Sequence, residues 1–245
     1  MAPPGGSTVV AGAHNLLSAT HPDTTPSAPS KGSIITSDGS TWLEKNVGSD
    51  GQVLTADSSQ ADGVKWVSGS GGGGLVLLEQ HAASASASLD FTTFVSSSYD
   101  EYEIHIVGLI PASASDLWMR MSTDGGATYD TSGVYANDSF VWRAGGSAVG
   151  GGTAATKCIL SFAGGSNQVQ SSTTHVVNAH MRLFDPASAS AYKAISGSVS
   201  YFDGNRVRNE FRDAYESTTA VNAVRFLMST GNITSGTIRI YGVQK

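Results

Sequence analysis

The feature that most constrains the fold is a two-residue alternation of apolar and polar side chains, which recurs through residues 75–245. In one such stretch Tyr102, Ile104 and Ile106 fall on the same face. Glycine-containing pairs separate the stretches, as turns separate strands, and no stretch keeps a 3.6-residue period over two or more turns. About ten strands in 171 residues predict an all-β chain whose C-terminal domain is an antiparallel β-sandwich or jelly roll.

Proline and glycine divide the chain into four segments. Five of the seven prolines lie within the first 29 residues, and residues 68–74 read Ser-Gly-Ser-Gly-Gly-Gly-Gly, which is typical of a flexible linker. We therefore expect an extended leader at 1–31, a short patterned region at 32–67, the linker at 68–74 and one domain at 75–245. A domain of this length is large enough to bury a core of its own.

The patterned region 32–67 contains an internal repeat. Its two copies, Gly32 to Asp38 and Gly51 to Asp57, start 19 residues apart, and a tryptophan follows each copy. Each copy reads as an apolar strand, a polar turn and a second strand, which is the pattern of a β-hairpin. Two hairpins carry too few apolar residues to offset the entropy of ordering them. We expect identical chains around a symmetry axis to complete a trimer core from the following residues: Ile35, Trp42, Leu54 and Trp66.

Charge and motif content argue against several classes of function. The formal net charge is −6, which opposes binding to nucleic acid, and no apolar run is long enough for membrane insertion. No nucleophile, nucleotide-binding or dinucleotide motif is present, so we expect neither an enzyme nor a cofactor. The six histidines and the single cysteine, Cys158, show no metal-ligand spacing, so the sequence predicts no metal site and no catalytic residue. The first residues lack the pattern of a secretory signal.

Two groups of side chains are the candidates for ligand contact. Arg206, Arg208 and Arg212 share one face of a predicted strand and could meet an acidic glycan or a phosphate. Ion pairing, between strands or subunits, is the structural alternative. Aromatic residues on predicted loops could stack on sugar rings, because each presents a flat apolar face with a polar edge; core or interface packing is their alternative. These aromatic residues are Tyr129, Tyr135, Trp142 and Tyr215.

Residues 13–67 resemble the shaft of bacteriophage fibre proteins. The similarity rests on His14–Thr24, on Val47–Asp57 and on the tryptophan that closes the second hairpin, Trp66. Such fibres carry strings of the form LLSATHxDT and GSxGQVLTxD at these places. The C-terminal domain is similar, over shorter stretches at its start and its end, to the β-rich tips that follow such shafts.

The resemblance implies a homotrimeric virion fibre or spike of the tail, neck or head, assembled in the cytoplasm of the bacterial host. In such fibres the N-terminal segment docks on other virion proteins, and the outermost domain binds a host-surface glycan or another envelope receptor. A trimer presents three equal sites, so weak contacts gain from avidity.

Two other functions stay open at this point. One is a capsid or neck decoration protein with a purely structural role, and the other is a glycan depolymerase. Ser122–Tyr129 is similar to the Asp-box that recurs in sialidases. In those enzymes the box is a structural turn and not the catalytic site, so it adds little to a depolymerase function.

Overall fold

A computed structural model describes residues 30–69, 74–162 and 168–244, and all but the last two residues of the predicted leader lie outside them. The described residues form sixteen β-strands, β1 to β16, and no helix. Consequently, this part of the chain has no helix long and apolar enough to span a membrane. The chain divides into two compact units, Met1–Ser70 and Gly71–Lys245, which are described separately. The all-β class predicted from the sequence is confirmed.

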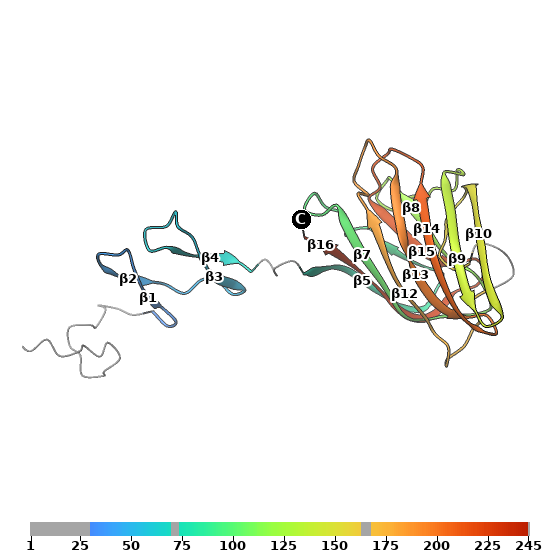
Figure 1. Ribbon diagram of the computed structural model, residues 1–245, viewed down its shortest axis with the longest axis horizontal. Helices are drawn as coiled ribbons and strands as arrows, with labels where there is room; N and C mark the ends of the chain where they lie inside the picture. Colours follow the sequence, from blue (N-terminus) through green and yellow to red (C-terminus); the bar gives the residue numbers. More distant parts are fainter. Residues whose placement is uncertain (1–29, 70–73, 163–167, 245) are drawn as a thin grey trace, which may run out of the picture. The chain divides into compact units, whose positions relative to one another are not determined.

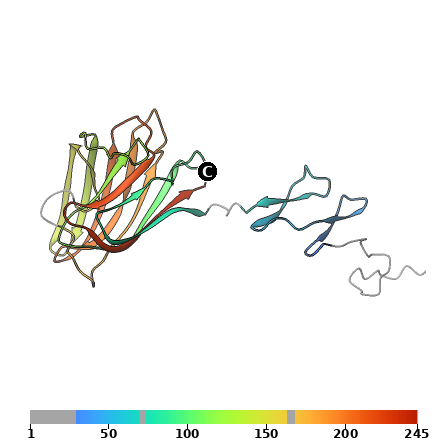
Figure 2. The same cartoon turned by 180° about the vertical axis from the view of Figure 1, so that it is seen from behind.

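The larger unit, the sandwich, consists of two antiparallel sheets (Figures 1 and 2). The large sheet has the order β10-β9-β14-β13-β12-β7-β16-β5, and the small sheet has the order β11-β8-β15-β6. The strands of the large sheet are β5 (Leu75–Ser86), β7 (Glu101–Pro111), β9 (Tyr135–Arg143), β10 (Gly146–Ala155), β12 (Val177–Phe184), β13 (Lys193–Phe202), β14 (Arg206–Tyr215) and β16 (Ile233–Val243). Those of the small sheet are β6 (Ser88–Phe91), β8 (Leu117–Ser122), β11 (Cys158–Ile159) and β15 (Ala223–Met228).

The hydrophobic core lies between these two sheets. The large sheet contributes inward-facing residues such as Ile104 and Val199, and the small sheet contributes Phe91 and Phe226; all four are 0% exposed. The two phenylalanine rings meet edge to face, with centroids 5.8 Å apart, which is a favourable geometry for aromatic pairs. Because side chains alternate across a strand, the opposite face of the large sheet is left to carry polar residues.

The sequence pattern misses β9 because two of its inward-facing residues, Asn137 and Ser139, are polar and hide the apolar alternation. The side-chain amide N–H of Asn137 donates to the Lys157 carbonyl at 3.1 Å, and its amide oxygen accepts the Ile159 N–H at 2.7 Å. This buried amide is therefore satisfied, as buried polar groups must be. The neighbouring β10 is composed of glycine and small residues around one valine, which also gives no clear apolar period.

The loop positions predicted for three aromatic residues are wrong. Tyr135 and Trp142 lie in β9, and Tyr215 is the last residue of β14. Tyr135 and Tyr215 face the core and are 0% and 2% exposed, with ring centroids 5.1 Å apart. Their hydroxyl groups have hydrogen-bond partners within the sandwich. The Tyr215 hydroxyl, for example, donates to the Asp130 carboxylate at 2.6 Å.

The smaller unit contains two hairpins, β1 (Ile34–Ser37) with β2 (Trp42–Lys45) and β3 (Gln52–Ala56) with β4 (Val64–Ser68). The internal repeat is visible in the backbone, because Gly32 and Gly51 occupy equivalent places and both have φ of +82°, a region that favours glycine. It is visible in the turns as well, where Asp38 and Asp57 each accept a backbone N–H from two residues further on, at 2.8 and 2.9 Å. Such aspartate turns explain why both hairpins form.

Polar contacts join the two hairpins to each other. The Asp62 carboxylate accepts the Thr36 hydroxyl at 3.0 Å and pairs with the Lys45 ammonium group at 2.8 Å. No residue between 30 and 69 is buried. The smaller unit therefore has defined turns and strand pairs but no hydrophobic core within one chain.

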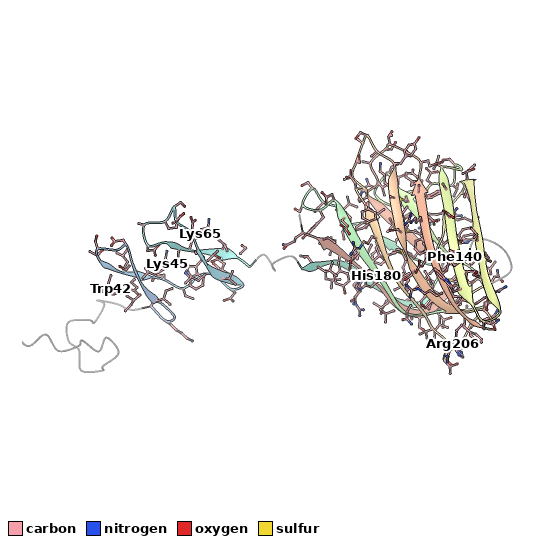
Figure 3. The ribbon with its side chains drawn as sticks, in the orientation of Figure 1. Trp42, Lys45, Lys65, Phe140, His180 and Arg206 are labelled. Atoms are coloured by element: carbon pink, nitrogen blue, oxygen red, sulfur yellow. The ribbon has the colours of Figure 1, made fainter. Side chains whose placement is uncertain are left out.

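The four residues predicted for a trimer core differ in how far their side chains are exposed within a single chain. Ile35, Trp42 and Leu54 are 64%, 68% and 40% exposed, and Figure 3 labels Trp42 on its hairpin. Trp66 is partly covered within its own unit, and its indole N–H donates to the Asn46 carbonyl at 2.8 Å. Three of these side chains are thus available to a second copy, whereas Trp66 already has a structural role.

Candidate functional site

A groove lined by serine runs along the outer face of the large sheet. Its floor is β13, where Ser196, Ser198 and Ser200 alternate with buried residues such as Val199. The side chains on the two adjacent strands, β14 and β12, are longer, and these strands lie about 10 Å apart. We call this feature the serine groove. Adjoining depressions of about 640, 610 and 340 Å³ follow its floor.

One wall of the serine groove is basic and belongs to β14. Arg206, Arg208 and Arg212 all point outward, as the sequence predicts, and Arg208 and Arg212 line the depression of about 610 Å³. Arg208 pairs with Glu210 at 3.1 Å, so the predicted alternative of ion pairing applies to this residue. Neither Arg206 nor Arg212 has an ion-pair partner among the described residues. These two guanidinium groups are available to an anion.

Aromatic side chains continue this wall beyond the arginines. Trp142, which is 44% exposed, lies directly opposite Arg208 in the register of β9 and β14. Phe140 is its outward-facing neighbour on β9, and the two ring centroids are 4.3 Å apart. Val149 of β10 lies opposite Phe140 and is 71% exposed. Together they form an apolar surface next to β14, where Arg208 lies opposite Trp142 and Glu210 lies opposite Phe140.

The opposite wall carries polar side chains of β12. His180 and Arg182 point outward, and His180 lines both the 610 Å³ and the 340 Å³ depressions. His180 is the register partner of His105 on β7. Figure 3 labels Phe140 on one side of β13 and His180 on the other. The groove therefore has an aromatic and basic wall facing a wall of imidazole and guanidinium groups.

The structure does not bring all predicted contact residues together. Trp142, Arg206, Arg208 and Arg212 share the outer face of the large sheet. Tyr135 and Tyr215 are core residues and do not contact a ligand at the surface. Burial raises the pKa of the Tyr215 hydroxyl to about 12. Tyr129 lies at the small sheet instead, where the Arg225 guanidinium group stacks 4.0 Å from its ring centroid.

Several groove residues are absent from the sequence-based set. Ser196 and Ser198 have a detectable signal, since serine at every second position of an apolar strand marks one face. Phe140 and His180 have none that we can identify, because their importance depends on which strands become neighbours. A sequence pattern describes one strand at a time, whereas the groove is formed by four adjacent strands.

The chemistry of the serine groove is that of binding. Hydroxyl groups on the floor donate and accept hydrogen bonds, free guanidinium groups attract anions, and an exposed indole offers a stacking surface. The predicted Asp-box-like turn is confirmed as a turn: the Asp124 carboxylate accepts the Thr128 N–H and hydroxyl at 2.9 and 2.6 Å. No protein-family model, curated protein or solved structure matches this chain.

Proposed function

We propose that the chain is a homotrimeric virion fibre or spike protein of a bacteriophage and that its sandwich attaches to an acidic glycan of the host surface in the serine groove. The main support is the wall in which the exposed Trp142 lies opposite Arg208. Arg206 and Arg212 lie two and four residues from Arg208 on the same face and have no ion-pair partner among the described residues. An acidic sugar chain offers carboxylates for the guanidinium groups and flat ring faces for the indole.

Shape and charge support this ligand class. The groove is open and long, which suits a polysaccharide chain better than a small molecule that needs an enclosed cavity. Although the chain has a net charge of −6, the three arginines of β14 bring guanidinium groups to the groove, beside the carboxylates of Asp138 and Glu210.

The hairpin unit supports assembly into a trimer. Ile35, Trp42 and Leu54 expose large apolar surfaces on a unit without any buried residue. Burial of these side chains against identical chains would supply the missing core, because each chain contributes the same apolar surface. The three serine grooves of one trimer would then strengthen weak attachment by avidity.

Binding to two soluble probes tests the proposal. The full chain is titrated with oligosaccharides of polygalacturonic acid, which carry uronic carboxylates, and with neutral dextran oligosaccharides. We expect preferential binding of the acidic probe. Trp142→Ala and Arg212→Gln should each weaken that binding about tenfold, which corresponds to about 1.4 kcal/mol.

Arg239→Gln is the matched control. It removes the same charge from the same sheet, but from β16, where the side chain already donates to Gln80 at 2.6 Å. Equal affinity of the control and of Arg212→Gln would show that only net charge matters. Absence of glycan binding, together with binding to capsid or neck proteins, would favour the decoration function.

A further inference from the structure

Two histidines and one glutamate meet on the outer face of the large sheet, beside the serine groove. His105 and His180 are direct register partners on β7 and β12, and Glu103 precedes His105 by two residues on the same face. One carboxylate oxygen of Glu103 lies 3.3 Å from Nε2 of His105 and 3.2 Å from Nε2 of His180. Ligand atoms of all three residues lie within 4.8 Å of one another.

These distances fit a tetrahedral metal site. Zinc–nitrogen and zinc–oxygen bonds of about 2.0–2.2 Å place ligand atoms about 3.3 Å apart at the corners of a tetrahedron. The two observed oxygen–nitrogen separations, 3.2 and 3.3 Å, already have this value. Two imidazoles and one carboxylate with a fourth open position are a recurrent zinc ligand set. The ligand nitrogens of the two imidazoles lie within 4.8 Å of each other, and rotation of the exposed His180 can bring them to the tetrahedral separation.

Surrounding groups hold the three ligands in place. The second carboxylate oxygen of Glu103 accepts a bond from Arg182 at 2.9 Å, which leaves the first oxygen directed at the histidines. The Tyr241 ring packs against His105 with centroids 4.9 Å apart. Such support of ligands by their neighbours is typical of metal sites.

We propose that Glu103, His105 and His180 bind one divalent transition-metal ion, with Zn²⁺ as the best match to this mixed nitrogen and oxygen ligand set. The ion replaces the two hydrogen bonds to the carboxylate, and each imidazole carries its proton on Nδ1 in the bound state. The depression of about 340 Å³ that His105 and His180 line gives the ion access and leaves the fourth position open to water or to an anionic ligand. The metal site does not rest on the proposed glycan binding, although His180 belongs to a wall of the serine groove as well.

Calorimetric titration of the metal-free full chain with Zn²⁺ tests the site. We expect one saturable site per chain that His105→Gln or His180→Gln weakens at least about tenfold, because even changes to surrounding groups cost about 10–100-fold in metal affinity. X-ray absorption of the zinc complex should show nitrogen and oxygen ligands at about 2.0–2.1 Å. Circular dichroism of each variant establishes that the sandwich is still folded.

Two controls separate this site from other histidines. His175→Gln changes a histidine near another part of the groove, where its ring stacks on Phe202, and should leave zinc affinity unchanged. The pair His14→Gln and His21→Gln, outside the described residues, should also leave it unchanged. The proposal is overturned if the chain shows no saturable zinc binding, or if the affinity survives His180→Gln but not the change at His14 and His21.

Discussion

Both units of this chain contain turns held by aspartate side chains, but they differ in whether a hydrophobic core lies beneath these turns. In the hairpin unit Asp38 accepts the backbone N–H of Ser40, two residues further on, and in the sandwich Asp130 does the same for Ser132. Yet no residue between 30 and 69 is buried, whereas the sandwich encloses a continuous apolar core. Local turn chemistry is therefore enough to shape a hairpin, and a core is a separate property that depends on what the hairpin packs against.

This difference extends to the ionisable groups. In the hairpin unit, the hydrogen-bonded Lys65 ammonium group holds the pKa of Asp57 well below its usual range. In the sandwich, burial raises the pKa of Asp213 to about 8. Desolvation therefore dominates at Asp213, and hydrogen bonds dominate at Asp57. Asp57 and Asp213 should thus contribute to stability in opposite directions as the pH changes.

Truncation of the sandwich core should have the largest effect. Phe226→Ala removes a fully buried ring and should lower the free energy of unfolding by about 3–5 kcal/mol, as measured by urea denaturation. Leu227→Ala, on the same strand but facing outward and partly exposed, is the control and should cost far less. Similar losses for both would mean that the small sheet is not packed as described.

A change of pH should have the next largest effect on the sandwich. Because the pKa of Asp213 is about 8 when folded and 3.8 ordinarily, the folded state keeps a proton that the unfolded state loses. Its contribution to stability is complete below pH 4 and is lost as pH rises towards 8. Between pH 5 and 7 the unfolding free energy should fall by about 3 kcal/mol from this group.

Asp213→Asn should flatten that dependence on pH, as followed by urea unfolding at several pH values. Asp57→Asn in the hairpin unit is the control and should leave the slope for the sandwich unchanged. The lowered pKa of Asp57 contributes stability above its ordinary range that disappears on acidification. A slope that survives Asp213→Asn would assign the pH response to another group.

A smaller effect is expected where two strands approach closely under the serine groove. A Cβ added at Gly197 would lie 2.5 Å from the His180 carbonyl oxygen and from Cβ of Met181. Gly197→Ala should therefore push β12 and β13 apart and cost about 1–3 kcal/mol. Thermal unfolding measures the loss. Ser198→Ala, on the outer face of the same strand, should be nearly neutral, and a neutral Gly197→Ala would show that the strands can separate freely.

The comparison also shows which features a sequence reveals. The outward direction of Arg206, Arg208 and Arg212 follows from alternation within one strand, and the hairpin turns follow from short aspartate and glycine motifs, so both are predictable. The meeting of His105 with His180 depends on the register of strands that are 75 residues apart, which no local pattern encodes. The burial of Tyr135 is unpredictable for a related reason, since its strand hides its alternation behind buried polar residues.

The smallest effect on a single chain should come from the hairpin unit. Trp42 is 68% exposed and lies opposite Ser37 in its hairpin, so Trp42→Ala should change the unfolding free energy of one chain by no more than about 0.5 kcal/mol. If identical chains complete the hairpin core, the same substitution should weaken association strongly. The solution mass of the full chain and the variant, measured by sedimentation equilibrium, separates these two effects.

The expected outcome is a trimer for the full chain and a shift towards the monomer for Trp42→Ala, with an unchanged sandwich. Thr41→Ala is a useful control, because it alters the adjacent turn without removing apolar surface. A trimer that tolerates Trp42→Ala but not changes on the sandwich would move the assembly surface to the larger unit. A monomer for the full chain would leave the exposed apolar residues of the hairpins to contact a different protein, and the absence of a core within one chain would then reflect that partner.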